Sequence, residues 1–302
     1  MKKNGKRENV QLYKCHACGR RFRSGGKPSK EEIWRMYMER KQTVAEISET
    51  TGLSASTIKR RLAEIELKWE QPRISGRGVV HMDATYFTRN KGILLAVESG
   101  TGRVLYMEHI SHERLADYKK AVNHISDNGY EITGLVVDGF KGLTKEFSRF
   151  KIQMCHFHLV AKVRTQLTKN PQLTAGRELL NLVYELKKMD KKSFTDEFQA
   201  WKKKWRDFLN EKSVDEVDGR AFFTHARLRS AVASIVRNLP YLFTYEEVEG
   251  MPPTNNQVEG TFTSLKRILQ VHPGMSEQSR DRLVDGFFLA YAELHNTKGD
   301  GL

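Results

Sequence analysis

The chain has 302 residues and a formal net charge of +14 at pH 7, from 51 Lys and Arg against 37 Asp and Glu. Its 39% hydrophobic and 29% charged residues are typical of a globular protein, which excludes a disordered or fibrous chain, and its length excludes a disulfide-stapled miniprotein. No run of about 18 apolar residues occurs, so we expect a cytoplasmic protein with no membrane partner.

The positive charge is concentrated near the N-terminus. Residues 1–80 contain 19 Lys and Arg against 9 Glu, a balance of +10, and the remaining residues carry only +4. A local basic segment favours nucleic acid or an anionic membrane surface as its partner. Because no basic helix with a strong apolar face accompanies it, we predict that the N-terminal segment binds DNA.

Residues 1–26 contain half of a zinc ribbon. Cys15 and Cys18 form a Cys-x-x-Cys-Gly turn after a predicted strand, and the only other cysteine is Cys155. Tetrahedral zinc needs four ligands, and the sequence has no second cysteine pair. Zn²⁺ is therefore expected here only if further ligands are supplied, and the alternative is a turn with two thiols and no metal.

Residues 27–70 are predicted to form a helix-turn-helix domain. Two helix starts have the spacing of a capping box: Ser29 with Glu32, and Thr43 with Glu46. Thr51-Gly52-Leu53-Ser54 is the turn, and the helix after it carries small polar and basic side chains that would meet phosphates and base edges: Ser56, Thr57, Lys59, Arg60 and Arg61. The alternative is a helical hairpin with a solvated charged face.

After a linker at 71–77, which is rich in Pro and Gly, the sequence changes to strands. Short apolar runs bounded by turn signals alternate with one amphipathic segment in this order: strands at 78–87, 92–97 and 103–107, a helix at 115–125, and strands at 132–139 and 152–155. This order predicts an α/β core with a mixed sheet over 78–158.

The next segment, 159–250, has helical periodicity throughout, with an apolar stripe from Leu179 to Leu186 and aromatic steps from Phe194 to Trp205. We predict a large all-α insertion there. The core is then expected to resume over 251–302 with a helix that starts near Asn256.

Three carboxylates are candidate metal ligands. Asp83 and Asp138 each end an apolar predicted strand, and Glu259 lies in the first turn of a predicted helix. Two divalent ions about 3.5–4 Å apart can promote phosphodiester displacement, and Mg²⁺ prefers carboxylate oxygens. Each residue also has a structural alternative: a turn after the strand for Asp83, an Asp-Gly turn for Asp138, and a capping box with Asn256 for Glu259.

Two further groups accompany the carboxylates. Lys266 and Arg267 follow Glu259 by about two helical turns, where they would contact DNA near the reacting phosphate. Cys155 and His158 form a Cys-x-x-His pair between a strand and a helix. Two ligands do not make a metal site, so a buried thiol and a histidine that orients the catalytic loop or touches DNA are favoured over zinc.

Four motifs in this order resemble a DDE transposase of the Mutator-like superfamily and its bacterial insertion-sequence relatives: Met82-Asp83-Ala84-Thr85-Tyr86, Val136-Val137-Asp138-Gly139, Cys155-His156-Phe157-His158, and the segment from Asn255 to Lys266. The resemblance covers residues 78–290. It implies an RNase H-like catalytic fold, with the helical insertion between the second Asp and the Glu. It also implies that Asp83, Asp138 and Glu259 bind two Mg²⁺ or Mn²⁺ ions, with Asn255 and Asn256 in support.

The resemblance further implies a prokaryotic DNA transposase that is associated with the nucleoid in the cytoplasm. Such an enzyme binds the terminal inverted repeats of its element, cleaves a strand there, and directs the freed 3′-hydroxyl against target DNA. Since two ends must be held together, a homodimer on double-stranded DNA is expected. The alternatives are a transposase-derived DNA-binding regulator without catalysis and a structure-selective nuclease.

Overall fold

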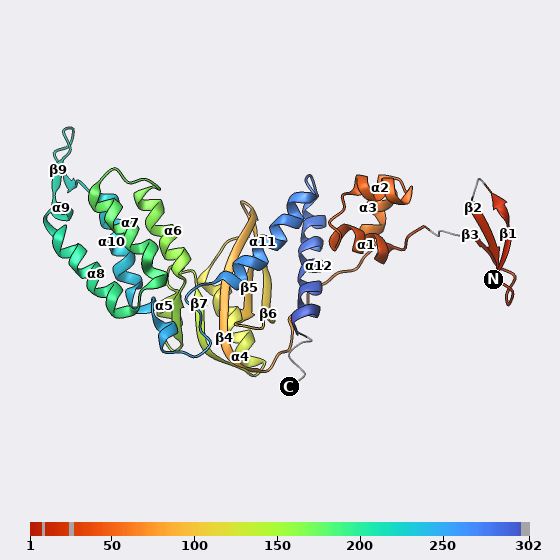
Figure 1. Cartoon of the computed structure of the whole chain (residues 1–302), viewed down its shortest axis with the longest axis horizontal. Helices are drawn as coiled ribbons and strands as arrows, with labels where there is room; N and C mark the ends of the chain where they lie inside the picture. The colour runs from red at the N-terminus through yellow and green to blue at the C-terminus, as the bar shows by residue number, and fades with distance from the viewer. Residues whose placement is uncertain (8–9, 24–26, 297–302) are drawn as a thin grey trace. The chain divides into compact units, whose positions relative to one another are not determined.

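The computed structural model describes residues 1–7, 10–23 and 27–296 (Figure 1). The chain divides into two compact units: Met1–Trp69 with Ser264–Tyr291, and Glu70–Thr263 with Ala292–Leu302. From the sequence, all of 251–302 was assigned to the core, whereas the structure groups residues 264–291 with the N-terminal helices. Residues 8–9 and 24–26 of the predicted ribbon segment, and 297–302 of the predicted core, lie outside the described residues.

The N-terminal segment forms a three-stranded antiparallel sheet from β1 (Lys2–Arg7), β2 (Val10–Lys14) and β3 (Arg21–Arg23). Cys15 and Cys18 lie in the turn between β2 and β3, and both are free thiols. Gly19 has a φ of +69° and donates its N–H to Cys15 O at 3.0 Å, which closes this turn. The predicted strand and Cys-x-x-Cys turn are present, and zinc at this turn stays a prediction.

Three short helices follow: α1 (Lys30–Met38), α2 (Val44–Thr51) and α3 (Ala55–Ala63). The predicted capping box is confirmed at α2, where Thr43 N donates to Glu46 Oε2 at 2.6 Å and Glu46 N donates to Thr43 Oγ1 at 3.2 Å. Gly52, with a φ of +66°, ends α2 in the left-handed conformation and allows the chain to turn into α3. Each helix has one completely buried Ile: Ile33 in α1, Ile47 in α2 and Ile58 in α3.

Two long helices end the described chain, α11 (Asn256–Val271) and α12 (Glu277–Asn296). Within the first unit, α12 approaches α1 closely, since a Cβ placed on Gly286 would lie 2.3 Å from a ring carbon of Trp34. His272 stacks on Tyr37 with ring centroids 3.8 Å apart, and its Nε2 lies 3.2 Å from Tyr37 O. These contacts explain why residues 264–291 group with the N-terminal helices.

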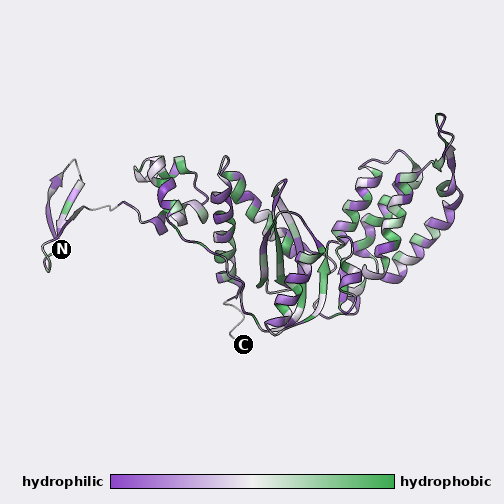
Figure 2. Cartoon of the chain, turned by 180° about the vertical axis from the view of Figure 1, so that it is seen from behind, coloured by the Kyte–Doolittle hydropathy of each residue, from purple (hydrophilic) through white to green (hydrophobic). Residues whose placement is uncertain are grey.

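The second unit is built on a five-stranded sheet in the order β6-β5-β4-β7-β8. Its strands are β4 (Gly76–Thr88), β5 (Lys91–Glu98), β6 (Val104–Ile110), β7 (Tyr130–Val137) and β8 (Lys151–Met154). β4, β5 and β6 pair antiparallel, whereas β7 is parallel to both β4 and β8. The predicted mixed sheet is thus confirmed, and Figure 2 shows its strands as predominantly hydrophobic.

Helix α4 (Leu115–Asp127) covers one face of this sheet. Its buried residues share a core with Val80, Met82 and Leu135, which point to that face. A short helix, α5 (Leu143–Glu146), connects β7 to β8. The opposite face of β4 and β7 is left for the segment that leads into α11, through a small cluster of Val79, Val136 and Met251.

The predicted helical insertion is present and has its own core. It contains α6 (His156–Leu167), α7 (Thr174–Glu185), α8 (Lys191–Lys204), α9 (Arg206–Asn210) and α10 (Ala226–Asn238), with the 3-10 turns η1 (Leu186–Lys188), η2 (Leu239–Tyr241) and η3 (Thr244–Glu246). The predicted apolar and aromatic positions are buried together, including Leu179, Phe194 and Phe198.

The insertion differs from the all-α prediction in one element. A hairpin of β9 (Lys212–Val214) and β10 (Ala221–Phe223) projects between α9 and α10.

No helix among the residues that the structure describes combines the length and apolar character needed to cross a bilayer.

Candidate metal centre

Asp83 lies on β4, and Asp138 directly follows the neighbouring parallel strand β7. The pairing of these strands ends at His81 opposite Val136, and Asp83 and Asp138 each come two residues later in the chain. Because side chains alternate along a strand, both Asp residues share a face with Val136, which is the face opposite α4. The strand register therefore brings two carboxylates together at this point of the sheet.

Asp83 does not end its strand, which corrects the sequence prediction. β4 continues to Thr88, because it stays paired with β5 as far as Thr88 opposite Lys91, and only β7 ends at Val137. Asp83 is consequently only 5% exposed. Asp138 does follow its strand, and its Oδ1 accepts the N–H of Phe140 at 2.8 Å, so the alternative of an Asp-Gly turn is also correct and fixes this carboxylate.

Asn255 fixes the start of α11 against β4. Its Nδ2 donates to Met82 O at 3.0 Å, and its Oδ1 accepts from His81 Nδ1 at 2.8 Å. Its backbone N–H donates to Cys155 Sγ at 3.2 Å. Since Asn255 is completely buried, these contacts hold the first turn of α11 against the strand that carries Asp83.

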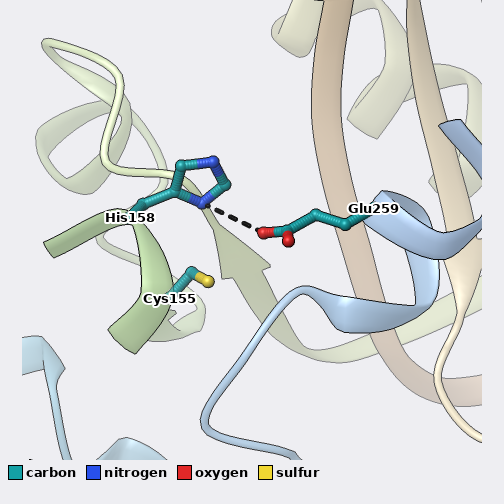
Figure 3. Close-up of side chains that lie close together, drawn as sticks. All are labelled: Cys155, His158 and Glu259. Carbon is teal, nitrogen blue, oxygen red and sulfur yellow. Dashed lines mark ion pairs between the residues drawn. The ribbon is translucent and has the colours of Figure 1, made fainter. Parts of the chain in front are cut away.

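Glu259 extends from this first turn, and its N–H donates to Asn255 O at 3.1 Å. The helix begins at Asn256, so Asn255 rather than Asn256 occupies the capping position. The alternative capping box of Asn256 with Glu259 is therefore wrong. Asn256 is exposed, whereas Glu259 is half-buried and faces α6 (Figure 3).

His158, in the first turn of α6, lies between two of the carboxylates. Its Nε2 is 4.0 Å from Asp83 Oδ2. Its Nδ1 is 3.7 Å from Glu259 Oε1, and Figure 3 shows this second pair. Asp83 and Glu259 are thus neighbours across a single imidazole ring. The structure brings together Asp83, Asp138 and Glu259, which lie far apart in the sequence.

Burial and neighbouring negative charges raise the pKa of Asp83, and burial raises that of Glu259. The pKa of Asp83 is well above its ordinary value, first because of burial and then because of the negative charges of Asp138, Glu259 and Glu113. Burial also raises the pKa of Glu259, against the opposing effect of His158. Such a cluster stores electrostatic repulsion that a bound cation would relieve.

Two residues of this site were missed from the sequence. Glu113, just before α4, adds a fourth carboxylate, and it accepts the hydroxyl hydrogen of Tyr118 at 2.6 Å. Lys162 donates to Gly139 O at 2.8 Å and so ties α6 to the loop after Asp138. Lys162 lies four residues after His158 on one helix face, which was a usable signal, whereas no sequence pattern marks Glu113.

The residues present fit a divalent metal. Asp83, Asp138 and Glu259 supply carboxylate oxygens, which are the ligands that Mg²⁺ and Mn²⁺ prefer. Glu259 Oε1 is buried and accepts no hydrogen bond from the residues that the structure describes. A buried carboxylate oxygen without a hydrogen-bond partner, in a cluster of acids with raised pKa values, fits a ligand of a divalent cation.

Gly139→Ala tests how the loop after β7 places Asp138. Gly139 has a φ of +77°, and a Cβ there would lie 2.3 Å from Met154 Sδ, which is buried. We expect crowding against Met154 to lower the free energy of unfolding of this variant by about 1–3 kcal/mol. The strain of a left-handed alanine adds to this loss. The variant should also bind divalent metal more weakly.

The matched control is Gly129→Ala. Gly129 has a φ of +87°, but no heavy atom lies within 4 Å of its Cβ position, so only the backbone strain remains. Denaturant unfolding and calorimetric metal titration would be compared for both variants. Equal losses of stability with unchanged metal affinity would contradict the role given to Gly139.

The predicted DNA-contacting residues lie on two helices. Ser56, Lys59 and Arg60 are exposed on α3, whereas Thr57 is partly covered and Arg61 donates through Nη1 to Pro28 O. Arg61 therefore also ties α3 to the segment before α1. Lys266 and Arg267 are exposed on the second half of α11.

The fold is a mixed α/β fold that is compatible with an RNase H-like core. Its candidate site consists of carboxylates near the place where the parallel strands β4 and β7 lie side by side. The sequence model described as "Transposase IS66 family" matches residues 71–266, which is more than half of the chain. The chain therefore belongs to the IS66 transposase family, a family of DDE transposases from insertion sequences.

Other comparisons add little. The chain is similar to one in a cryo-EM structure of the simian T-cell lymphotropic virus intasome in complex with PP2A regulatory subunit B56 gamma, at 12% identity and a TM-score of 0.22. That similarity covers 52% of this chain and 69% of the other. Because the TM-score is so low, we infer nothing about this chain from it. Among curated proteins, none matches this chain.

Proposed function

We propose that this protein is an active DNA transposase that cleaves and joins DNA strands with Asp83, Asp138 and Glu259 as its metal-binding triad. One observation carries this proposal: Asp83 and Glu259 lie within 4.0 Å of the same His158 ring, while the charge of Asp138 raises the pKa of Asp83. Membership of the IS66 transposase family supports the same function. The finer relation to the Mutator-like superfamily rests on the motif resemblance alone.

The three carboxylates would hold two Mg²⁺ or Mn²⁺ ions. When bound, such ions activate the attacking oxygen and stabilise the leaving oxygen in phosphodiester displacement. Water would attack the phosphorus at the element's end, and the bond to the 3′-oxygen would break to give a 3′-hydroxyl and a 5′-phosphate. That hydroxyl would then attack a phosphodiester of the target, joining the strands and releasing a second 3′-hydroxyl.

The chain's own residues position this chemistry. Asn255 anchors the first turn of α11 to β4, which sets the distance of Glu259 from Asp83. Lys162 and the N–H of Phe140 hold the loop that carries Asp138. These contacts let the carboxylates keep their arrangement when no ion is bound.

DNA recognition belongs to the N-terminal part in this proposal. Residues 27–70 form the helix-turn-helix domain and α3 reads the terminal inverted repeats, with Ser56, Lys59 and Arg60 as its exposed contacts. Residues 1–26 act as a partial zinc ribbon, 71–77 as the linker, 78–158 with 251–302 as the catalytic core, and 159–250 as the insertion. Two copies would hold two element ends at the nucleoid.

The experiment that tests the function is a strand-cleavage assay on DNA that carries the element's end. We expect Mg²⁺ or Mn²⁺ to produce a nick at the end with a free 3′-hydroxyl, and a chelator to prevent it. A DNA-binding regulator would bind this DNA without cleaving it. A structure-selective nuclease would cleave junctions or hybrids irrespective of the terminal sequence.

A further inference from the structure

A second kind of metal site overlaps the carboxylate cluster. Cys155, His158 and Glu259 each offer one ligand atom, and these three atoms all lie within 4.8 Å of one another. Figure 3 shows the thiol, the imidazole and the carboxylate directed toward a common space between α6 and α11. Cys155 is fully buried, whereas His158 and Glu259 are each about one quarter exposed.

Two of these ligand atoms face each other without a hydrogen bond. His158 Nδ1 and Glu259 Oε1 are both buried, and neither has a hydrogen-bond partner in the part of the chain that the structure describes. They are 3.7 Å apart, which is too long for a hydrogen bond. Ligand atoms around one tetrahedral zinc lie about 3.5 Å apart, given metal–ligand bonds of about 2.0–2.3 Å.

The donor set differs in chemistry from that of the triad. A thiolate, an imidazole and one carboxylate are the ligands that Zn²⁺ and Co²⁺ take, whereas Mg²⁺ takes oxygen ligands and avoids sulfur. Three protein ligands leave a fourth tetrahedral position for water. Asp83 faces the other ring nitrogen, Nε2, at 4.0 Å and so lies outside this set.

The thiol has a defined place in the fold. Cys155 precedes α6, and its Sγ accepts the N–H of Asn255 at 3.2 Å, which fixes the sulfur next to the first turn of α11. Burial raises the pKa of Cys155 to about 11, so the thiol keeps its proton until a metal ion replaces it. A buried thiol that is unreactive by itself is still available as a ligand.

We propose that Cys155, His158 and Glu259 form a binding site for Zn²⁺ and similar thiophilic cations. The site shares Glu259 with the triad, and this part of the inference rests on the proposed function. Zn²⁺ bound at Glu259 would take up one of its carboxylate oxygens and add a positive charge beside the triad, so it would compete with Mg²⁺ for Glu259. Zn²⁺ therefore inhibits Mg²⁺-dependent strand cleavage by occupying a site of its own.

The test is a Co²⁺ titration of the full chain carrying Cys15→Ser and Cys18→Ser, which leaves Cys155 as its single thiol. We expect one equivalent of Co²⁺ to produce the intense near-ultraviolet absorption of a thiolate–cobalt bond, and Zn²⁺ to remove it. Cys155→Ser in this background should abolish the absorption. His158→Ala should weaken Co²⁺ binding by more than about 100-fold, beyond the cost of outer-shell changes.

Absence of the absorption in the background protein would overturn the proposal, as would its persistence in Cys155→Ser. If Cys155→Ser proves unfolded by circular dichroism, His158→Ala decides, since its ring is partly exposed and unchanged Co²⁺ affinity there would also overturn it.

Asp83→Asn separates this inference from the proposed function. It removes a triad carboxylate but none of the three thiophilic ligands, so the thiolate–cobalt absorption should persist. Because Asp83 faces the second ring nitrogen of His158, Co²⁺ affinity should fall by no more than the roughly 10–100-fold typical of an outer-shell change. Cobalt binding without any metal-dependent cleavage would contradict only the proposed function. Cleavage by a protein that shows no thiolate–cobalt absorption would contradict only the site proposed here.

Discussion

Asp83→Asn is expected to abolish Mg²⁺-dependent cleavage at the element's end while binding to that DNA persists. Asp83 is close to the charge of Asp138 and faces His158 opposite Glu259, so its substitution removes a carboxylate oxygen from the centre of the cluster. Loss of about 4 kcal/mol of metal-derived transition-state stabilisation corresponds to roughly a 10³-fold lower rate. Single-turnover cleavage and a gel-shift measurement on the same DNA would report the two properties.

The same substitution should stabilise the metal-free protein at neutral pH. The pKa of Asp83 is raised in the folded state, so its contribution to stability is fully present below its unfolded pKa of about 3.9 and is lost as the pH rises through the folded value. The wild-type protein should therefore lose stability across that range without metal, and Asp83→Asn should lose less. Asp127→Asn, at an exposed position on α4, is the matched control.

Asp83→Asn retaining wild-type cleavage would remove Asp83 from the triad. A variant that loses both cleavage and stability would indicate a structural role instead. Asp127→Asn should leave cleavage and its metal dependence unchanged.

Lys59→Ala combined with Arg60→Ala is expected to weaken binding to the terminal inverted repeat by about 10–100-fold or more, as one or two contacts of 1–3 kcal/mol are lost. Both side chains are exposed on α3, and Arg60 forms a long ion pair of 3.8 Å with Glu64. If both contact phosphates, the slope of log affinity against log salt should fall by about 2. Fluorescence anisotropy at several salt concentrations would measure both quantities.

The control has the same change in charge elsewhere: Lys187→Ala with Lys188→Ala, at exposed positions of the insertion. Its effect on specific affinity should be small, because these residues lie outside α3. Equal losses in both double variants would mean that recognition depends on general positive charge and not on α3. Cleavage at saturating protein should survive in the α3 variant.

Much of this architecture could be predicted from local sequence patterns. β7 was predicted because its apolar, β-branched run matches a strand buried on both faces. The turn after α2 was predicted because Thr43, Glu46 and Gly52 carry local capping signals that need no tertiary context. The sequence indicated that Asp83 and Asp138 lie close together, because each comes near the end of an apolar run. The parallel pairing of β4 with β7 gives the physical reason.

The remaining features depend on contacts between distant segments. The strand predicted at 78–87 ends close to the observed end of β4 at Thr88, but the burial of Asp83 within the strand could not be predicted, since it depends on pairing with β5. Glu113 and the grouping of α12 with α1 likewise follow from packing, which no local spacing encodes. The third ligand beside Cys155 and His158 was hidden for the same reason, as Glu259 reaches them only through the fold.

In the proposed function, Asp83, Asp138 and Glu259 form a single centre for hard divalent cations. The most direct measurement is the anomalous scattering of Mn²⁺ in crystals of the full chain grown with that ion. We expect manganese within about 2.2 Å of carboxylate oxygens from these residues. Manganese bound only elsewhere, with the three carboxylates turned apart or paired with Lys or Arg, would contradict it.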